Sequence, residues 1–382
     1  MDYSSLGLDD KLRSVNSLTS GTTIQSLGFE NNYELPTGAI NYTNLSKASR
    51  PYDAVVSLSG ELGTFKDIQL AINYVNSIGG GTVFISNGTY IISEDITVYS
   101  NIRIVGEDQF STILDFNNST KYIKVIGTEE NRLNNVIFEK FSIINSLAWE
   151  SGFISVIYLD NIKFDSLYFG DCYDSSEKAV VRVKIYSVTN CTVKSCFSDN
   201  AGIISVENYC EKVSIVENLS KNALDTPITL IGGSGITISQ NYILNCSLGI
   251  SCDNSESIIT ENNIDTCLIG IRVLNGKKNI IIANNTISPD TNATAGVLIG
   301  TASGSECIIS SNQIIGLWTT GISLVNGDKN IITSNIITGS TTGILIDANS
   351  DRNIVVANFL YGSATPITDS GSNTTAANNI VA

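Results

Sequence analysis

A short pattern of hydrophobic and polar positions recurs along the chain at intervals of 21 to 34 residues. Apolar and polar residues alternate within each copy, as in "NIITSNIITG" at residue 330 and "NIVVANFLYG" 23 residues later. Such alternation within a repeat of this length is typical of a β-solenoid and excludes helical repeats. Eleven copies can be aligned, and they begin at Asn101, Asn135, Asn161, Asn190, Lys212, Gly235, Glu256, Asn279, Glu306, Lys329 and Arg352.

Two positions of the repeat predict how successive coils stack. The third residue after each start is apolar in all eleven copies, from Ile104 to Val355. In a parallel β-helix, equivalent residues lie about 4.8 Å apart along the axis, so this column is expected to face inward. Stacked amide side chains can hydrogen-bond to one another, which predicts an asparagine ladder. Its members, six residues after the last seven starts, are Asn218, Asn241, Asn262, Asn285, Asn312, Asn335 and Asn358.

Two stretches lie outside the repeat. Apolar residues at helical spacing, followed by glycines from Gly79, predict a helix of about residues 64–78 with Thr64 as its N-cap. We expect this helix to cover the first coil, because an open β-helix end exposes unpaired strand groups. Residues 1–50 show no repeat, which leaves open an irregular extension or an attachment segment. The chain is therefore divided into residues 1–50 and a β-helix domain of residues 51–382.

The composition of the chain excludes several kinds of partner and functional site. A formal net charge of -15 argues against a nucleic-acid partner, which needs a basic face. The chain has no His, so His-based triads and His-ligated zinc sites are excluded. The N-terminal stretch lacks the basic and apolar regions of a signal peptide, and we expect neither membrane insertion nor a metal or cofactor. Buried free thiols are favoured for the scattered cysteines, which are Cys172, Cys191, Cys196, Cys210, Cys246, Cys252, Cys267 and Cys307.

Residues 51–108 add a family likeness. The stretch from "PYDAVVSLSG" through "FKDIQLAINYVNSIGGGTVFISNGTY" to "NIRIVGED" resembles the opening of pectate-lyase-like right-handed parallel β-helix proteins. That group includes polysaccharide lyases, family 28-type glycoside hydrolases and viral tailspikes. The resemblance, which extends over about residues 50–380 with the later coils, implies an all-β, single-stranded right-handed parallel β-helix, for which the repeat gives about eleven coils. It carries no catalytic residue over, because the His-containing polygalacturonase motif and a clustered-Asp calcium motif are both absent.

Candidate site residues are concentrated in the first half of the domain. Outward positions carry Glu139, Asp165 and Lys194, with Lys163 nearby, and further along the coil Arg182, Lys184 and Tyr186 alternate with apolar residues. The longest repeat spacings also fall here, so loops are expected beside this charged wall. These loops contain the remaining candidates, which are Trp149, Asp171, Tyr173, Asp174 and Glu177.

These residues suit two kinds of polysaccharide cleavage. A hydrolase would use two carboxylates, for which Asp171, Asp174 and Glu177 are candidates, and exposed aromatic rings would bind sugar. A lyase would need cations around a uronate and a base, for which Lys184 and Tyr186 are candidates. Charges on an outer β-helix face can also simply solvate it.

The hypothesis is a carbohydrate-engaging surface protein of tailspike type, with a polysaccharide or surface glycan as its partner. The tailspike likeness implies a homotrimer on a virion or at an extracellular surface, with residues 1–50 docking to a larger assembly. The competing hypothesis is a non-catalytic adhesin or structural element.

Overall fold

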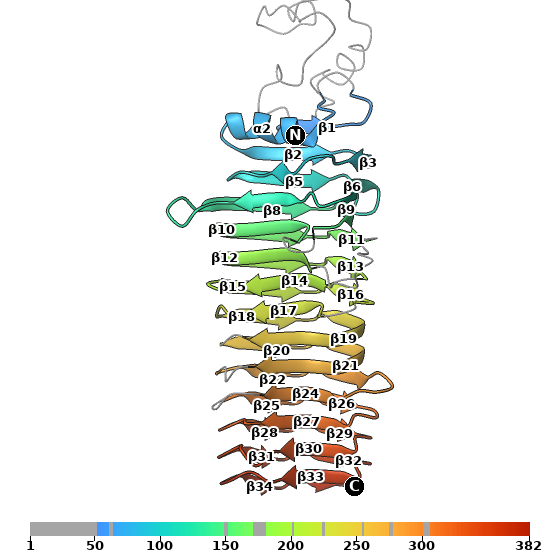
Figure 1. Cartoon of the computed structure of the whole chain (residues 1–382), viewed down its shortest axis with the longest axis vertical. Helices are drawn as coiled ribbons and strands as arrows, with labels where there is room; N and C mark the ends of the chain where they lie inside the picture. The colour runs from blue at the N-terminus through green and yellow to red at the C-terminus, as the bar shows by residue number, and fades with distance from the viewer. Residues whose placement is uncertain are drawn as a thin grey trace, which may run out of the picture.

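The computed structural model describes residues 52–60, 64–148, 152–170, 181–200, 202–223, 226–253, 256–274, 278–300 and 306–382. These residues form one rod in which the chain winds as a right-handed parallel β-helix (Figure 1). Every strand pairing among the described residues is parallel, and each strand pairs with its equivalents in the coils before and after it. The predicted fold is therefore confirmed.

Three faces make up each coil, and we name them A, B and C. Four long strands turn a corner and contribute to two faces: β10 (Ile154–Asp165) and β12 (Val181–Lys194) join face C to face A, while β19 (Tyr242–Asp253) and β21 (Asn263–Leu274) join face B to face C. The other strands of face A are β1 (Ala54–Val56), β2 (Gly81–Ile85), β5 (Ile102–Gly106), β8 (Leu133–Glu139), β15 (Glu211–Val216), β18 (Ile236–Ser239), β20 (Ser257–Thr260), β22 (Ile281–Ala283), β25 (Ile308–Ser310), β28 (Ile331–Thr333), β31 (Ile354–Val356) and β34 (Thr375–Ala377).

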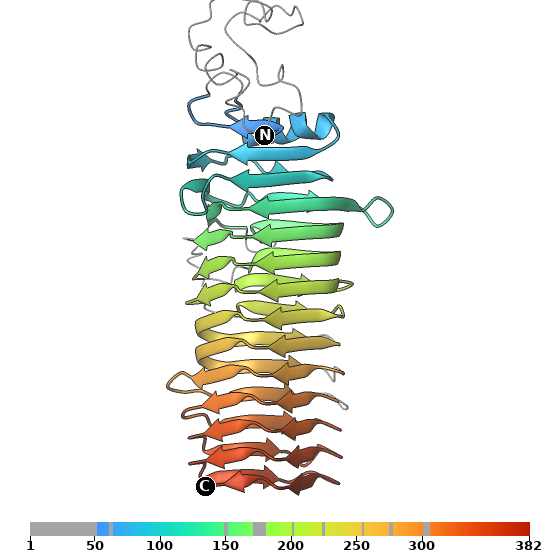
Figure 2. The same cartoon turned by 180° about the vertical axis from the view of Figure 1, so that it is seen from behind.

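The remaining strands belong to the other two faces. Those of face B are β3 (Gly88–Ile91), β6 (Thr112–Ser119), β9 (Ser142–Ser146), β11 (Tyr168–Gly170), β13 (Phe197–Asp199), β16 (Leu219–Lys221), β23 (Thr286–Pro289), β26 (Gln313–Ile315), β29 (Ile336–Thr338), β32 (Phe359–Tyr361) and β35 (Ile380–Val381). Those of face C are β4 (Ile96–Thr97), β7 (Ile123–Ile126), β14 (Gly202–Glu207), β17 (Ile228–Ile231), β24 (Ala295–Gly300), β27 (Thr320–Val325), β30 (Thr342–Ile346) and β33 (Thr365–Asp369). Figure 2 shows the rod from behind.

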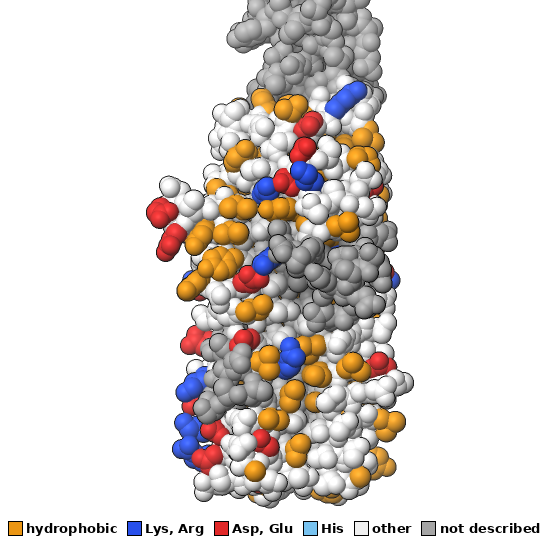
Figure 3. Space-filling model, in the orientation of Figure 1, with side chains coloured by type: hydrophobic (Ala, Val, Ile, Leu, Met, Phe, Trp, Pro, Cys, Tyr) orange, Lys and Arg blue, Asp and Glu red, His pale blue; other side chains and the backbone are white. Residues whose placement is uncertain are grey.

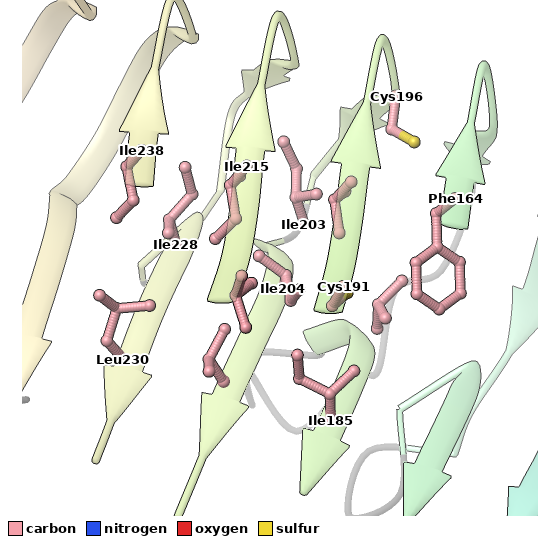
Figure 4. Close-up of a cluster of buried hydrophobic side chains, with 14 of the residues drawn as sticks. Phe164, Ile185, Cys191, Cys196, Ile203, Ile204, Ile215, Ile228, Leu230 and Ile238 are labelled. Carbon is pink, nitrogen blue, oxygen red and sulfur yellow. The ribbon is translucent and has the colours of Figure 1, made fainter. Parts of the chain in front are cut away.

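The predicted inward column is continuous from Ile104 to Val355, with neighbouring members paired in register. The column extends beyond the eleven predicted members, through Val83 to Ala54 at its N-terminal end and to Ala376 at its C-terminal end. The rod makes about 12 turns, slightly more than the eleven coils predicted. Apolar side chains from the three faces meet inside the coils (Figure 4).

The asparagine ladder is confirmed. Each buried amide donates from Nδ2 to Oδ1 of the next Asn, at 2.9 Å from Asn241 to Asn262 and 3.0 Å from Asn262 to Asn285. Each Oδ1 also accepts the backbone N–H of the preceding Asn, as Asn262 does from Asn241 at 3.0 Å. The ladder continues to Asn379, one residue beyond the predicted column.

The first residue of every copy lies in the left-handed region of backbone conformation, with φ from 39° at Glu306 to 63° at Gly235. This column forms the corner at which the chain enters face A. Asn and Gly adopt such a conformation at low cost, which explains why they fill six of the eleven starts.

The capping helix is shorter than predicted. Helix α2 spans Ile68–Ser77, and its N-cap is Asp67, whose side chain accepts the N–H of Leu70, rather than Thr64. Phe65, the residue after Thr64, lies in an extended β-bridge with Val56. It donates its N–H to the backbone oxygen of Val55, and its own backbone oxygen accepts the N–H of Ser57. The buried residues Ile68, Ala71, Ile72 and Val75 face the first coil, as expected.

The seven described cysteines are free and buried, as predicted; Cys172 lies outside the described residues. Cys246 and Cys267 are paired in register on consecutive coils. Burial raises the pKa of the Cys196 thiol to about 12 and that of the Cys307 thiol to about 12, so both stay protonated and act as small apolar core residues.

Candidate glycan site

The predicted site residues are divided between two faces of the rod. Glu139, Asp165 and Lys194 are neighbours in register on face A, and Lys163 lies beside them. Lys184, by contrast, lies in the part of β12 that forms face C. The prediction of one charged wall is therefore wrong, since the chain turns a corner between the two groups.

The face A group is a ladder of ion pairs. Glu139 accepts from Arg103 at 2.5 Å and lies 3.5 Å from the Nζ of Lys163, which also contacts Asp165 at 2.7 Å. Lys194 contacts Glu217 at 3.3 Å in the next coil. The hydrogen bond to Asp165 raises the pKa of Lys163, so the pairing is strong enough to favour its charged form. These side chains therefore stabilise the stacking of coils against one another, although exposed pairs of this kind contribute little individually.

The loop candidates Trp149, Asp171, Tyr173, Asp174 and Glu177 lie outside the described residues. The strands on either side of them are described: β9 and β11 end on face B, and β10 and β12 begin on face C. The segments that carry these candidates therefore connect strands of face B to strands of face C.

Arg182 is fully buried, which contradicts its predicted place on an exposed wall. Its guanidinium lies over the ring of Phe153 at 4.4 Å, and Nη2 donates to the backbone oxygen of Asp199 at 3.4 Å. A buried cation over an aromatic ring positions the start of β12 rather than meeting a ligand in solution.

Face C carries an ion pair and a tyrosine ladder on neighbouring coils. Lys184 Nζ lies 3.0 Å from Glu207 Oε1 on the next coil. The ring of Tyr186 meets that of Tyr158 at 5.9 Å and that of Tyr209 at 6.1 Å, both edge to face. Hydrophobic side chains gather at the height of β10 and β12 on the face shown in Figure 3, with charged side chains beside them.

The tyrosine ladder is held in an unusual conformation. Tyr158 has φ 52° and Tyr209 has φ 62°, a region that bulky residues rarely adopt. Tyr209 is nevertheless 73% exposed, so packing of its ring into the core does not explain its presence. Arg132 braces the first ring: its guanidinium lies 6.0 Å from the Tyr158 centroid, and it donates to Asp160 at 3.0 Å.

The electrostatics of Tyr186 do not favour its predicted role as a base. Partial desolvation raises its pKa, and the neighbouring Tyr158, Tyr209, Glu129 and Glu207 raise it further. The hydroxyl is therefore protonated at neutral pH, which suits a hydrogen-bond donor rather than a general base.

Sequence reasoning missed Tyr158, Tyr209, Arg132 and Glu207. The two tyrosines did carry a signal, because together with Tyr186 they recur at about one coil's spacing. That recurrence could have been recognised by the same alignment that located the asparagine ladder.

A groove lies far from this site, at the N-terminal end of the rod. A groove of about 650 Å³ runs between α2 and strands β3 and β4, with Leu58, Leu70 and Ile91 exposed along it. It adjoins the cap rather than the tyrosine ladder.

Neither a metal cluster nor a membrane span is found in the described part of the chain. No three His, Cys, Asp or Glu side chains there are grouped so that they could hold a metal ion. Within the same residues, no helix is long and apolar enough to cross a bilayer.

Comparison with known families agrees with this architecture. The profile described as rhamnogalacturonase A/epimerase, pectate lyase-like, matches residues 64–272, more than half of the chain. The chain belongs to this pectate lyase-like family. A second profile, the right-handed β-helix region, matches residues 227–381 of this family member. No curated protein matches the sequence significantly.

Solved structures share the family's fold at low identity. The catalytic unit of a GH87 α-1,3-glucanase from Streptomyces thermodiastaticus is 13% identical, with a TM-score of 0.65 over 91% of this chain and 69% of that one. The A-module of the Azotobacter vinelandii mannuronan C-5 epimerase AlgE6 is 14% identical, with a TM-score of 0.62 over 82% and 94%. A tailspike mutant of E. coli bacteriophage HK620, in complex with a pentasaccharide, is 15% identical, with a TM-score of 0.52 over 82% and 62%.

Proposed function

We propose that this pectate lyase-like protein binds an extended glycan along the edge of face C, over the rings of Tyr158, Tyr186 and Tyr209. The observation that carries the proposal is the tyrosine ladder, in which Tyr209 is 73% exposed, Tyr158 and Tyr186 are half-buried, and Tyr158 and Tyr209 have left-handed backbone conformations. Aromatic faces bind the C–H groups of sugars, and the Tyr hydroxyl adds a hydrogen-bonding group. The rings follow one another along the rod, so a ligand that contacts all three must be extended.

Two further features support this function. Among the similar structures named above, one is a mannuronan epimerase, one is an α-1,3-glucanase and one is a tailspike in complex with a pentasaccharide. Lys184 and Glu207 beside the ladder offer charged hydrogen-bonding partners to a polar ligand. Trp149 and Tyr173, on loops that begin on face B and end on face C, are proposed as additional sugar-binding residues.

Tyr209→Ala is expected to weaken glycan binding by about tenfold, since one aromatic contact contributes roughly 1 kcal/mol beyond its buried area. Binding would be measured by calorimetry on a panel of acidic and neutral polysaccharides. Tyr209→Phe keeps the ring and should stay within about twofold of the wild type. Tyr361→Ala is the matched control, because Tyr361 is 56% exposed but lies on face B. Equal affinities for Tyr209→Ala and Tyr361→Ala would refute the tyrosine site.

Cleavage of the bound glycan is the second part of the proposal, and Asp171, Asp174 and Glu177 are the preferred catalytic residues. The raised pKa of Tyr186 makes it a poor base, and Lys184 is paired with Glu207, so the described residues favour hydrolysis over a lyase reaction. The alternative is a non-catalytic adhesin that uses the same ladder.

Product assays separate these alternatives. Each polysaccharide of the panel would be incubated with the protein and assayed for new reducing ends and for unsaturated uronates. Hydrolysis predicts reducing ends without unsaturation, with activity lost in Asp171→Ala, Asp174→Ala or Glu177→Ala but tyrosine-dependent binding retained. Unsaturated products that require Lys184 or Tyr186 would contradict the hydrolase proposal. Binding without any product would establish the adhesin.

The likeness to a tailspike also supports a place on a virion or an extracellular surface. We propose residues 1–50 as the segment that docks to a larger assembly there. Truncation of residues 1–50 would then abolish incorporation into that assembly and leave glycan binding unchanged.

A further inference from the structure

Two cysteines lie side by side at one corner of the rod. Cys246 and Cys267 are paired in register between β19 and β21, so they occupy the same position on consecutive coils. Each follows a residue in the left-handed backbone region, Asn245 with φ 57° and Thr266 with φ 56°. Both side chains are buried where the chain turns from face B to face C, with Cys246 6% exposed and Cys267 fully enclosed.

This pair is isolated from the other thiols. Among the described residues, no other two cysteines are paired across neighbouring strands; Cys191 and Cys252, for example, have aliphatic residues at the paired position on both neighbouring coils. The coil after Cys267 carries Pro289 at this position, and the coil before Cys246 carries Ala223. Each thiol of the pair therefore has the other, and no third thiol of the described chain, as its stacked neighbour.

The spacing of the two coils suits a disulfide bond. Paired residues on neighbouring strands lie about 4.8 Å apart, and disulfide-bonded cysteines have Cα atoms roughly 4.4 to 6.8 Å apart. The side chains are also in contact, because the thiol of Cys267 hydrogen-bonds to the sulfur of Cys246. The two sulfur atoms are thus neighbours before any bond joins them.

The contact between the two thiols gives them different reactivity. The hydrogen bond lowers the pKa of the Cys246 thiol in spite of its burial, and it raises the pKa of the Cys267 thiol. Burial instead raises the pKa of Cys210 to about 11 and that of Cys196 to about 12. Because the thiolate is the form that reacts with oxidants, Cys246 is the most reactive of these four thiols.

We propose that Cys246 and Cys267 form an oxidation-dependent disulfide bond that joins and stabilises two consecutive coils. The oxidant is a peroxide, which is small enough to reach a sulfur atom in a largely buried side chain. The Cys246 thiolate attacks one oxygen of hydrogen peroxide, the O–O bond breaks, and the departing hydroxide takes up the proton that Cys246 released. This step gives one water and a sulfenic acid at Cys246.

The second step closes the bond between the coils. The sulfur of Cys267 attacks the sulfur of Cys246, the S–O bond breaks, and the departing hydroxide takes the Cys267 proton to give a second water. Two thiols are thereby oxidised to one disulfide, and one peroxide is reduced to two waters. Both cysteines lie on strands that run from face B into face C, so the bond fixes the stacking of the coils at this corner.

Thiol counting and peptide mapping of the full-length protein test this proposal. A Cys172→Ser background removes the one cysteine outside the described residues and leaves the seven described thiols. The folded protein is treated with a small excess of hydrogen peroxide, the peroxide is removed with catalase, and the remaining thiols are alkylated in denaturant. Two fewer thiols should be alkylated than before oxidation, and one linked pair of peptides should contain Cys246 and Cys267. An unchanged thiol count or linkage of a different pair would overturn the proposal.

Alanine variants test the order of the two steps. Alanine already occupies this column at Ala223, so Cys246→Ala and Cys267→Ala should fold, which circular dichroism checks. Oxidised Cys267→Ala should retain a sulfenic acid at Cys246 that dimedone labels, whereas Cys246→Ala should remain unlabelled at Cys267. Equal labelling of the two variants would contradict the assigned order. Cys252→Ala is the control and should form the same disulfide as the parent protein.

Thermal unfolding tests the effect on stability. The disulfide should raise the unfolding midpoint by at least about 3 °C, because it restricts the unfolded chain. A phosphine reductant should reverse the shift, and Cys246→Ala treated in the same way should show none. An unchanged midpoint in protein whose peptide map contains the disulfide would refute the stabilising role.

Discussion

Replacing Asn262 by Ala is expected to lower the free energy of unfolding by about 3 to 5 kcal/mol, a large effect for one side chain. Oδ1 of Asn262 accepts two hydrogen bonds from Asn241, at 3.0 Å from the backbone and 2.9 Å from the side chain. Nδ2 donates to the backbone oxygens of Ile238 and Thr260. The substitution therefore leaves the buried N–H of Asn241 without its acceptor and removes one partner from each of Asn241 Nδ2, Ile238 O and Thr260 O. Unsatisfied buried groups cost more than a lost bond between exposed groups.

The neighbouring residue provides a matched control. Asn263 is exposed on face B, so Asn263→Ala removes the same atoms from water and should change stability by less than about 0.5 kcal/mol. Urea titration followed by circular dichroism compares the two variants. Hydrogen exchange should show the loss of protection concentrated in the coils next to Asn262, because each coil of a solenoid contacts only its neighbours. Equal stabilities of the two variants would mean that the ladder does not stabilise the stack.

The sequence predicts the fold well because stacked coils require the same type of residue to recur at the coil spacing. A column such as Ile104 to Val355 must be apolar in every coil, and the Asn column must be polar in every coil where it bonds to itself. Both constraints repeat at the coil spacing and can be read without a structure. Helix α2 was also predictable, although its start was not, because Thr64 and Asp67 are both good N-caps and only the bridge made by Phe65 decides between them.

The site was less predictable, because face assignment depends on where the chain turns. Lys184 and Lys194 are ten residues apart on one strand, and no pattern of alternation marks the corner between them. The left-handed residues Ser187 and Asn190 create that corner. Arg182 shows a second limit, since alternation places it outward while the ring of Phe153 and the Asp199 carbonyl hold it in a buried position.

The tyrosine ladder and the ion pairs of face A follow from the same physical rule. Any outward position of a β-helix is repeated at the next coil, so a chain that keeps one residue type there produces a continuous stripe. Where the stripe is charged, as on face A near Glu139, its members neutralise one another. Where it is aromatic, as in the tyrosine ladder, its rings contact one another and still leave ring surface in water, as Tyr209 does, which directs attention to a ligand.

Replacing Gly321 by Ala is expected to destabilise the rod by roughly 2 to 4 kcal/mol. A Cβ at Gly321 would lie 2.5 Å from Cγ2 of Ile337 and 2.7 Å from the backbone oxygen of Gly343 in the next coil. The methyl group therefore cannot be accommodated by a side-chain rotation alone, and two coils must move apart. Gly300→Ala is the control, because a Cβ there would meet its nearest neighbour, Val325, at 4.0 Å.

The two glycine variants should change the free energy of unfolding in opposite directions, which makes the comparison informative. Ala restricts the unfolded chain more than Gly does, so Gly300→Ala should leave stability unchanged or raise it by up to about 1 kcal/mol. The same entropic gain applies at Gly321 and is outweighed there by the contact with the next coil. Thermal unfolding followed by circular dichroism measures both. If Gly321→Ala were as stable as Gly300→Ala, the close approach of coils at this corner would not limit the residue to glycine, and the glycines at Gly249, Gly270 and Gly343 would need another explanation.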